Sequence, residues 1–330
     1  MRMPFLRTRQ NRYALQEQLS TFTGSGQRRL YKSRIAIVGL GAIGSVLAEI
    51  LARAGIGKIH LIDRDIVELE NLHRQHLYTE KDIGRAKADS AMQRLQAINS
   101  EIKITSAIID LTATNIDELK KKDLILDCTD NLETRFLIND YCRKRKIPWI
   151  HANAARDIGS IIIFRHDKES PCFRCIYEGK ESELSCERDG VLPELTTIIA
   201  GLQAHGAIQE LLGKKQETEL LRLNLAENQL DKIKINQAET CNTCKRKEFP
   251  ALTQKKQQKT VKLCGSSCYQ ISGKLIDLKK IKQKLEKIGK VDDLTHCIRY
   301  KNMTIFSDGR VLIKTESLEE AKALYQKIIQ

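Results

Sequence analysis

The stretch that decides the fold is Ile35-Ala-Ile-Val-Gly-Leu-Gly-Ala-Ile-Gly44, in which an apolar run leads directly into the glycine pattern Gly39-x-Gly41-x-x-Gly44. Apolar residues at helical spacing follow from Ser45 to Ala54, and residues 58–62 form a second apolar run that ends at Asp63. A strand, a helix and a strand in this order predict one βαβ unit, with parallel strands and a right-handed crossover.

The same alternation continues beyond this unit. Apolar periodicity predicts helices over residues 86–99, 135–144 and 193–212, and strands over 103–109, 124–126, 148–150 and 160–164. Strands that alternate with helices in this way are typical of an open α/β sheet. The sequence therefore predicts a Rossmann-like, mostly parallel sheet.

The last part of the chain has a different pattern. A Lys- and Gln-rich stretch with one proline, residues 249–260, is interpreted as a linker. Beyond it we expect a helical stripe from Leu278 to Ile288, short strands joined by the hairpin signal Asp308-Gly309, and a final helix capped by Ser317. The predicted organisation is an N-terminal helical extension (1–30), a nucleotide-binding domain (31–248), the linker (249–260) and a small α+β domain (261–330).

Composition limits the class of protein. The chain has 330 residues, of which 41% are hydrophobic and 30% charged, as in a soluble globular protein. No apolar run is long enough to span a bilayer, and no apolar stretch follows the basic N-terminus, so we expect a cytoplasmic protein without a membrane segment. The formal net charge of +14 indicates an acidic partner: nucleic acid, anionic lipid, a nucleotide or an acidic protein.

The glycine turn has the composition of a phosphate-binding loop. Glycines between a strand and a helix allow backbone N–H groups to approach an anion, and the helix dipole favours negative charge there. Asp63, at the end of the second strand, is placed to accept hydrogen bonds from ribose hydroxyls. These features fit an adenine nucleotide, and taken alone they would favour a nicotinamide-dependent dehydrogenase.

Further charged residues favour a triphosphate over a dinucleotide. Arg74 and Lys87 add two cations after Asp63, and these could hold β- and γ-phosphates and stabilise a departing pyrophosphate. Asp130, at the end of a predicted strand, is a candidate Mg²⁺ ligand. The alternative is that both cations are simply exposed and that Asp130 is a helix cap.

Four of the ten cysteines fall in two Cys-x-x-Cys pairs: Cys172, Cys175, Cys241 and Cys244. In such a pair both sulfurs can bind one tetrahedral ion, so the pairs predict a structural zinc site. A redox dithiol is the alternative. Cys128 and Cys142 lie in or beside apolar elements and are expected to be small core residues.

Taken together, these motifs resemble the ThiF/MoeB family, whose members are adenylyltransferases similar to ubiquitin-activating enzymes. The resemblance rests on the glycine pattern, Asp63-x-Asp65, Asn71-x-x-Arg74-Gln75, Gly84-x-x-Lys87 and Asp127-Cys-Thr-Asp130-Asn131, and it runs from about Tyr13 to Lys245. It implies that ATP-Mg²⁺ adenylates the C-terminal glycine carboxylate of a small ubiquitin-like sulfur-carrier protein. Such carriers serve thiamine, molybdopterin or tRNA-thiolation pathways.

The resemblance also implies residue roles. Arg74 and Lys87 would stabilise charge at the α- and γ-phosphates, Asp130 would bind Mg²⁺, and the four paired cysteines would bind Zn²⁺. Cys186 matches a cysteine that can take the activated acyl group or enter sulfur transfer; Arg188 favours its thiolate and Glu187 opposes it. The expected nucleotide-binding set is Gly39, Gly41, Ala42, Gly44, Asp63, Asp65, Asn71, Arg74, Gln75, Lys87, Asp130 and Asn131.

The partners implied are the carrier ending in Gly-Gly, a second copy of the chain in a homodimer, and a sulfurtransferase or cysteine desulfurase. Two positions depart from the family pattern. Ala42 stands where relatives often have glycine, and Leu15 stands where they have an arginine that reaches the ATP of the partner subunit. Arg9 or Arg12 could replace that arginine.

Two further functions remain as alternatives. An activator of a tRNA-borne carboxylate would use the positive charge, but relatives of that kind lack the paired cysteines, so we do not expect nucleic-acid binding. An inactive scaffold that only binds a carrier is not favoured, because all the charged site residues are present.

Overall fold

The predicted βαβ unit forms as β1 (Arg34–Val38), α3 (Ala42–Arg53) and β2 (Lys58–Ile62). The strands pair in parallel, with Ile35 opposite Ile59. The computed structural model describes residues 11–20, 22–167, 169–179, 190–214, 217–253, 260–263, 268–294 and 297–329. Helix α3 begins three residues before the predicted start, because the last part of the glycine pattern is already helical.

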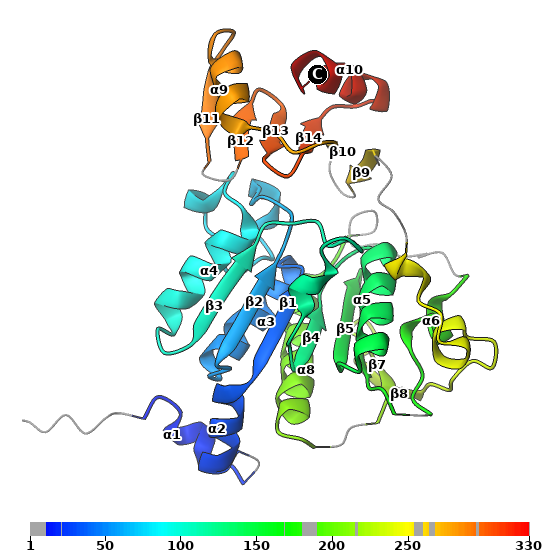
Figure 1. The fold of residues 1–330 in the computed structure, drawn as a ribbon. Helices are drawn as coiled ribbons and strands as arrows, with labels where there is room; N and C mark the ends of the chain where they lie inside the picture. Colours follow the sequence, from blue (N-terminus) through cyan, green and yellow to red (C-terminus); the bar gives the residue numbers. More distant parts are fainter. Residues whose placement is uncertain are drawn as a thin grey trace, which may run out of the picture.

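An eight-stranded sheet contains this unit, in the order β3-β2-β1-β4-β5-β6-β7-β8 (Figure 1). The further strands are β3 (Lys103–Ala107), β4 (Leu124–Asp127), β5 (Trp149–Ala155), β6 (Ile158–Phe164), β7 (Glu219–Asn224) and β8 (Gln229–Lys234). The first five strands are parallel, whereas β6, β7 and β8 add antiparallel pairs. The prediction of a Rossmann-like, mostly parallel sheet is confirmed. The β7–β8 hairpin was not predicted.

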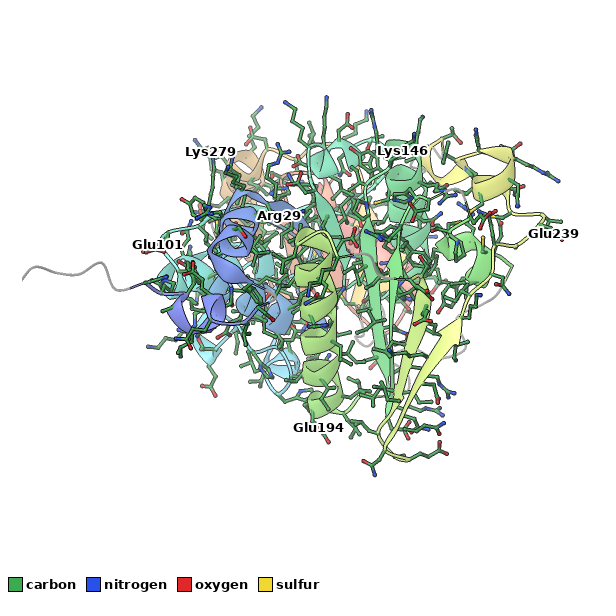
Figure 2. All side chains as sticks on the ribbon, turned by 90° about the horizontal axis from the view of Figure 1, so that it is seen from below. Arg29, Glu101, Lys146, Glu194, Glu239 and Lys279 are labelled. Atoms are coloured by element: carbon green, nitrogen blue, oxygen red, sulfur yellow. The ribbon has the colours of Figure 1, made fainter. Side chains whose placement is uncertain are left out.

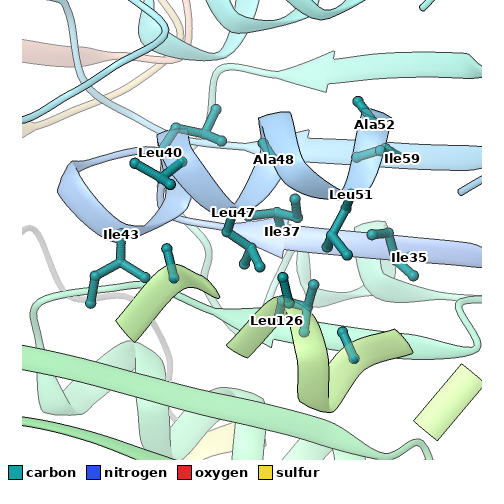
Figure 3. Close-up of a cluster of buried hydrophobic side chains, with 14 of the residues drawn as sticks. Ile35, Ile37, Leu40, Ile43, Leu47, Ala48, Leu51, Ala52, Ile59 and Leu126 are labelled. Carbon is teal, nitrogen blue, oxygen red and sulfur yellow. The ribbon is translucent and has the colours of Figure 1, made fainter. Parts of the chain in front are cut away.

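Helices cover both faces of the sheet. Helix α3, α4 (Lys87–Ile98) and α8 (Pro193–Leu211) pack on one face, and α5 (Leu132–Arg145) packs on the other. Figure 3 shows Leu47 and Leu51 of α3 against side chains of β1 and β4. From the side opposite the C-terminal sheet, α8 runs along the near face with Glu194 at one end (Figure 2).

Two short helices precede the sheet, α1 (Ala14–Glu17) and α2 (Thr23–Lys32). Tyr13 and Gln27 tie them to the ends of α4 and α3: Asn99 Nδ2 donates to the Tyr13 hydroxyl at 2.9 Å, and Gln27 Nε2 donates to the Ala54 carbonyl at 3.1 Å. In the described part of the chain, no helix is both long and apolar enough to cross a membrane.

A second, six-stranded antiparallel sheet follows, in the order β11-β12-β13-β14-β10-β9. Its elements are β9 (Thr260–Leu263), β10 (Cys268–Ser272), α9 (Leu278–Glu286), β11 (Val291–Asp293), β12 (Cys297–Tyr300), β13 (Met303–Phe306), β14 (Arg310–Lys314) and α10 (Leu318–Ile329). Figure 1 shows this sheet, in orange and red, above the carboxyl ends of the parallel strands.

Several local predictions for this part hold. The hairpin at Asp308-Gly309 joins β13 to β14, with Gly309 at a φ of 90°. Ser317 accepts the Glu320 N–H at 3.2 Å, as a cap should, but the Glu320 carboxylate accepts from Thr315. Ile288 is exposed and lies beyond the end of α9, so the apolar stripe is shorter than predicted.

The stretch interpreted as a linker begins against the core. Residues 250–252 form a 3₁₀ turn, in which Ala251 is buried and its N–H donates to Asp140 Oδ2 at 3.0 Å. Residues 254–259 lie outside the described part of the chain.

Candidate active site

A cavity of about 570 Å³ opens at the carboxyl ends of the parallel strands. It lies where the strand order reverses, since β1 is flanked by β2 and β4, and open α/β sheets bind ligands at such a point. Its lining includes most of the predicted nucleotide-binding set: Gly39, Gly41, Ala42, Asp63, Asp65, Asn71, Arg74, Gln75, Lys87, Asp130 and Asn131. Gly44, the third residue of α3, is buried and is not part of the lining.

The glycine turn is shaped by close backbone contacts. Gly39 has a φ of 89°, and a Cβ there would lie 2.6 Å from the Cys128 carbonyl oxygen. A Cβ on Gly44 would collide with the Gly39 carbonyl. Gly41, by contrast, has open space, with Gln75 Nε2 nearest at 3.9 Å. Because α3 has no side-chain cap, its first N–H groups face this space and are available to an anion.

Asp63 links the glycine turn to the end of β2. Its carboxylate accepts the Leu40 N–H at 2.6 Å and the Asp65 N–H at 2.7 Å. Burial raises the pKa of Asp63 to about 6, and the charge of Asp65 adds to the rise. The sequence had assigned this carboxylate to ribose; the structure shows that it also holds the turn, and a carboxylate retains acceptor sites beyond two hydrogen bonds.

Lys87 is a buried cation at the first turn of α4, only 6% exposed. Its Nζ lies 3.7 Å from Asp65 Oδ2, and its N–H donates to the Asp65 carbonyl at 2.9 Å. A buried ammonium group needs a nearby negative charge, which Asp65 supplies. Asp65 therefore positions Lys87 in the cavity wall.

Arg74 is half-buried and lines the same cavity. Its Nη1 donates to the Glu70 carbonyl at 2.8 Å and lies beside the His73 ring. Among the described residues, no carboxylate forms an ion pair with it. The positive charge of Arg74 is therefore available to an anionic ligand.

Gln75 presents an unsatisfied acceptor. The side chain is 3% exposed, and within the described ranges its Oε1 has no hydrogen-bond partner. A buried amide oxygen without a partner is costly, so a ligand that donates a hydrogen bond here would be favoured. The neighbouring Asn71 instead accepts the Glu68 N–H at 3.2 Å and holds the local turn.

Asp130 and Asn131 follow β4 at the opposite side of the cavity. Asn131 caps α5, since its Oδ1 accepts the Thr134 N–H at 2.9 Å, and its Nδ2 donates to Asp130 Oδ1 at 3.2 Å. The helix-cap role considered for Asp130 therefore belongs to Asn131. Asp130 is exposed in the lining, as a carboxylate would need to be in order to bind a metal ion that also binds phosphate.

Beneath this loop lies a buried polar network that the sequence did not reveal. Asp127 accepts from His151 Nδ1 at 2.7 Å and from the Thr129 hydroxyl at 2.6 Å. Arg135 Nη2 donates to the Thr129 carbonyl at 2.5 Å. Burial lowers the pKa of His151. The network fixes the backbone before Asp130. Its sequence signal is the presence of His151 inside a buried strand and of Arg135 inside a helix.

The two Cys-x-x-Cys pairs converge as predicted. The four sulfurs lie within 4.8 Å of one another, at 3.9 Å for Cys172–Cys175, 3.7 Å for Cys172–Cys241 and 3.7 Å for Cys175–Cys244. Four thiolates about 2.3 Å from a tetrahedral zinc ion would be roughly 3.8 Å apart. The donor set therefore fits zinc. Hydrogen bonds from Cys172 and Cys244 lower the pKa of the Cys175 thiol.

Asp140 of α5 joins the two cysteine loops. Its buried carboxylate accepts from Arg174 Nε and Nη2, each at 2.9 Å, and from the Thr243 hydroxyl at 3.2 Å. Arg174 lies between the cysteines of the first pair, and Thr243 between those of the second. The cysteine site is thus anchored to the helix that follows Asp130.

The remaining predicted site residues are not placed in the cavity. Cys186 and Arg9 lie outside the described residues. Leu15 is 80% exposed, and Arg12 donates to the Ile98 carbonyl at 3.2 Å and lies 3.8 Å from Glu101. Cys142 is a buried core residue as expected, whereas Cys128 also lines the cavity.

The chain is similar to known proteins. Residues 13–245 match the ThiF family. The chain is 33% identical to the sulfur carrier protein ThiS adenylyltransferase of Bacillus subtilis over 96% of its own length and 99% of the relative's. It is 38% identical to adenylyltransferase and sulfurtransferase MOCS3 of Culex quinquefasciatus over 61% of its length, and spans about half of that relative, 47%.

The fold resembles a solved structure as well. The crystal structure of Escherichia coli MccB with AMPCPP and MccA matches with a TM-score of 0.63 and 25% identity, over 72% of this chain and 74% of that one.

Proposed function

Because the chain belongs to the ThiF family, we propose that it uses ATP to adenylate the C-terminal glycine carboxylate of a small ubiquitin-like sulfur-carrier protein and releases pyrophosphate. The observation that carries this proposal is the match to a ThiS adenylyltransferase along nearly the whole of both chains. The site residues and their roles are proposals drawn from the cavity.

The cavity supports this chemistry. A carboxylate is a poor acyl donor, and a mixed anhydride with AMP is a good one. In the reaction a carboxylate oxygen forms a bond to the α-phosphorus while the bond to the β-phosphate oxygen breaks. The protein's task is to align the two anions and to offset their charge.

Each part of the lining has a function in that task. The first N–H groups of α3 would hold phosphate, Asp63 would bind ribose, and Gln75 would accept a hydrogen bond through its free oxygen. Arg74 and Lys87 would stabilise the charge that collects on the departing pyrophosphate. No general base is required, because the nucleophile is already ionised near neutral pH.

Two metals are proposed. Asp130 would hold Mg²⁺ together with phosphate oxygens, a common arrangement for that ion. Cys172, Cys175, Cys241 and Cys244 would hold Zn²⁺ in a closed structural site. When bound, Mg²⁺ neutralises phosphate charge and Zn²⁺ cross-links the two loops.

Among carriers, a ThiS-type protein is favoured. The ThiS adenylyltransferase aligns over 96% of the chain, which includes the C-terminal sheet, whereas the MOCS3 relative aligns over 61%. A homodimer, a sulfur-donating partner enzyme and a cytoplasmic location complete the proposal.

The test is ATP–pyrophosphate exchange with ThiS-type and molybdopterin-type carriers that end in Gly-Gly. We expect exchange only when a carrier is present, and fastest with the ThiS type. Arg74→Ala should abolish it, since one transition-state charge contact is worth about 10²–10³ in rate. Arg53→Ala is the matched control, because Arg53 lies on α3 and pairs only with Glu49 among the described residues.

Exchange by Arg74→Ala at the wild-type rate would remove Arg74 from the site. Exchange by the wild-type chain in the absence of a carrier would contradict the proposed substrate. A lack of exchange with every carrier tested would contradict it as well.

A further inference from the structure

The C-terminal sheet has two differently populated faces. Side chains alternate along its strands, so that Tyr269, Ile271, Ile305, Val311 and Ile313 pack against α9 and α10. The other face carries polar side chains that are nevertheless buried: Gln270, Ser272, Thr304 and Arg310. Buried polar groups need partners, so this face must be covered by hydrogen-bonding groups.

Arg310 shows what covers it. The side chain is only 1% exposed, and its guanidinium donates to the Arg64 carbonyl at 2.9 Å and to the Ile108 carbonyl at 3.2 Å. These carbonyls lie just beyond the ends of β2 and β3. Asp308 holds the same guanidinium at 2.6 Å. One side chain thus joins the second sheet to the loop that carries Asp63 and Asp65.

Two further contacts reach residues of the cavity wall. Gln270 Nε2 lies 3.4 Å from Asp110 Oδ2, and Lys314 forms an ion pair with Glu68. Asp110 and Glu68 both line the cavity.

The same face also contributes to the lining itself. Cys268 of β10 and Leu312 of β14 line the cavity, and both pack in one apolar cluster with Ile66 and Phe306. Phosphate is expected at the first turn of α3 and ribose at Asp63, so the base should extend toward β3. The residues just after β3 that line the cavity are Ile109, Asp110 and Leu111.

From these contacts we infer that the C-terminal sheet is a wall of the nucleotide site. Leu312 and Cys268 contact the nucleoside half of ATP, and Arg310 is a positioning residue for the loop of Asp63 and Asp65. This inference rests on the proposed use of ATP and adds a binding role for the second sheet. Because Leu312 and Cys268 line the cavity, changes to them should act on nucleotide binding.

Leu312→Trp tests the wall directly in the full-length chain, because it adds bulk to the lining. We expect affinity for AMPCPP, measured by calorimetry, to fall about ten-fold, as for an overpacked contact. In exchange assays KM for ATP should rise by the same factor, with KM for the carrier unchanged. Leu275→Trp is the matched control: it adds the same bulk to the same sheet domain at an exposed position.

Arg310→Lys tests the positioning role. Lysine keeps the charge but cannot bind two carbonyls in a fork, so KM for ATP should rise about five-fold without a change in KM for the carrier. A variant that lost folding would affect both constants and the melting temperature alike. If Leu312→Trp fails to fold, Leu312→Phe and Leu312→Ala provide the same comparison.

Unchanged AMPCPP affinity in folded Leu312 variants would overturn the inference, as would equal effects on ATP and carrier. If the wild-type chain bound AMPCPP but exchanged with no carrier, the proposed function would fail and calorimetry would still decide the role of the wall.

Discussion

At the scale of single residues, Asp63 shows how one buried group connects structure to nucleotide binding. Its two oxygens accept the backbone N–H groups of Leu40, in the glycine turn, and of Asp65, after β2. Burial makes the charged form costly and raises its pKa to about 6, whereas an ordinary aspartate has a pKa near 3.9. The Asp63 carboxyl therefore titrates closer to neutral pH than an ordinary aspartate does.

We expect KM for ATP to rise as the pH falls through about 6, because protonated Asp63 can no longer accept both N–H bonds and bind ribose. The carrier carboxylate stays ionised in this range, so KM for the carrier should not follow. Exchange kinetics between pH 5 and 8 measure both constants.

Asp63→Asn is the control for this pH dependence. It should raise KM for ATP at every pH and remove the inflection near 6. An inflection that persists in this variant would assign the titration to another group. The sign for stability is opposite: a raised carboxyl pKa in the folded state means that its contribution to stability falls as the pH rises from about 4 to 6.

Cys186 gives a second prediction at this scale. Adenylation needs no thiol, so Cys186→Ser should keep ATP–pyrophosphate exchange and lose only a later acyl or sulfur transfer. Exchange and transfer of sulfur to the carrier are measured separately. Loss of exchange in Cys186→Ser would place the thiol in the first step.

The residue types in the cavity could be predicted from the sequence because the glycine pattern follows one predicted strand and the charged residues follow the next. Gly39, Arg74 and Lys87 are examples, and the cavity brings them together. What the sequence could not show is which polar residue holds another. Asn131 rather than Asp130 caps α5. His151 pairs with Asp127, which lies 24 residues earlier, on the neighbouring strand.

At the scale of elements, the strand–glycine turn–helix junction allows the clearest mutational comparison. Gly44→Ala would drive a Cβ into the Gly39 carbonyl, and the turn would have to move. We expect a loss of about 2–3 kcal/mol in the free energy of unfolding, and weakened nucleotide binding. Chemical denaturation and AMPCPP calorimetry measure the two effects.

Gly201→Ala in α8 is the matched control, since a Cβ there has nothing within 4 Å. It should stabilise the chain by about 0.5–1 kcal/mol, the usual gain from alanine in a helix. Similar effects of the two substitutions would mean that the tight contact at Gly44 does not constrain the turn.

The cysteine loops provide the next prediction. The purified chain should contain about one zinc ion per chain, as a closed four-cysteine site holds one ion. Cys244→Ser should lose the metal and lower the melting temperature, while Cys142→Ala, a buried cysteine outside the site, should keep it. Metal analysis and thermal melts provide the measurements; zinc retained by Cys244→Ser would exclude this ligand set.

Elements with strong periodicity were predictable, and the β7–β8 hairpin was not. Leu230 and Ile233 of β8 are exposed and are separated by two charged residues. The strand therefore has neither a buried apolar run nor one face that is apolar throughout. Edge strands of this kind depend on pairing with a neighbour, here β8 with β7.

At the scale of the whole molecule, polar contacts join the two sheets, and the one made by Arg310 is buried. Arg310, Gln270 and Lys314 all bond to residues in the loops that follow β2 and β3. Separation of the two sheets would expose Arg310 and break its hydrogen bonds to the Arg64 and Ile108 carbonyls. We therefore expect a single cooperative thermal transition, with the same midpoint by circular dichroism and by the fluorescence of Trp149 in the first sheet.

Two separated transitions would show that the sheets unfold independently, against this expectation. Addition of AMPCPP should raise the midpoint of the whole transition, because a ligand that binds only the folded state stabilises all that unfolds with its site.

This packing was hidden in the sequence for a physical reason. Strands with alternating apolar and polar residues are typical of a sheet with one solvated face. In β10 and β14 the polar residues Gln270 and Arg310 are buried instead. Groups just beyond the strands of the first sheet accept from them: the carboxylate of Asp110 from Gln270 Nε2, and the carbonyls of Arg64 and Ile108 from Arg310. Local pattern cannot distinguish water from such partners.

The place of Leu312 in the cavity wall has a consequence for biosynthesis. The glycine turn emerges from the ribosome about 270 residues before β14, so the nascent chain displays most of the groups proposed to bind phosphate long before the pocket closes. Tight nucleotide capture should therefore be one of the last properties that the polypeptide acquires, and incomplete translation products would not compete with finished enzyme for ATP.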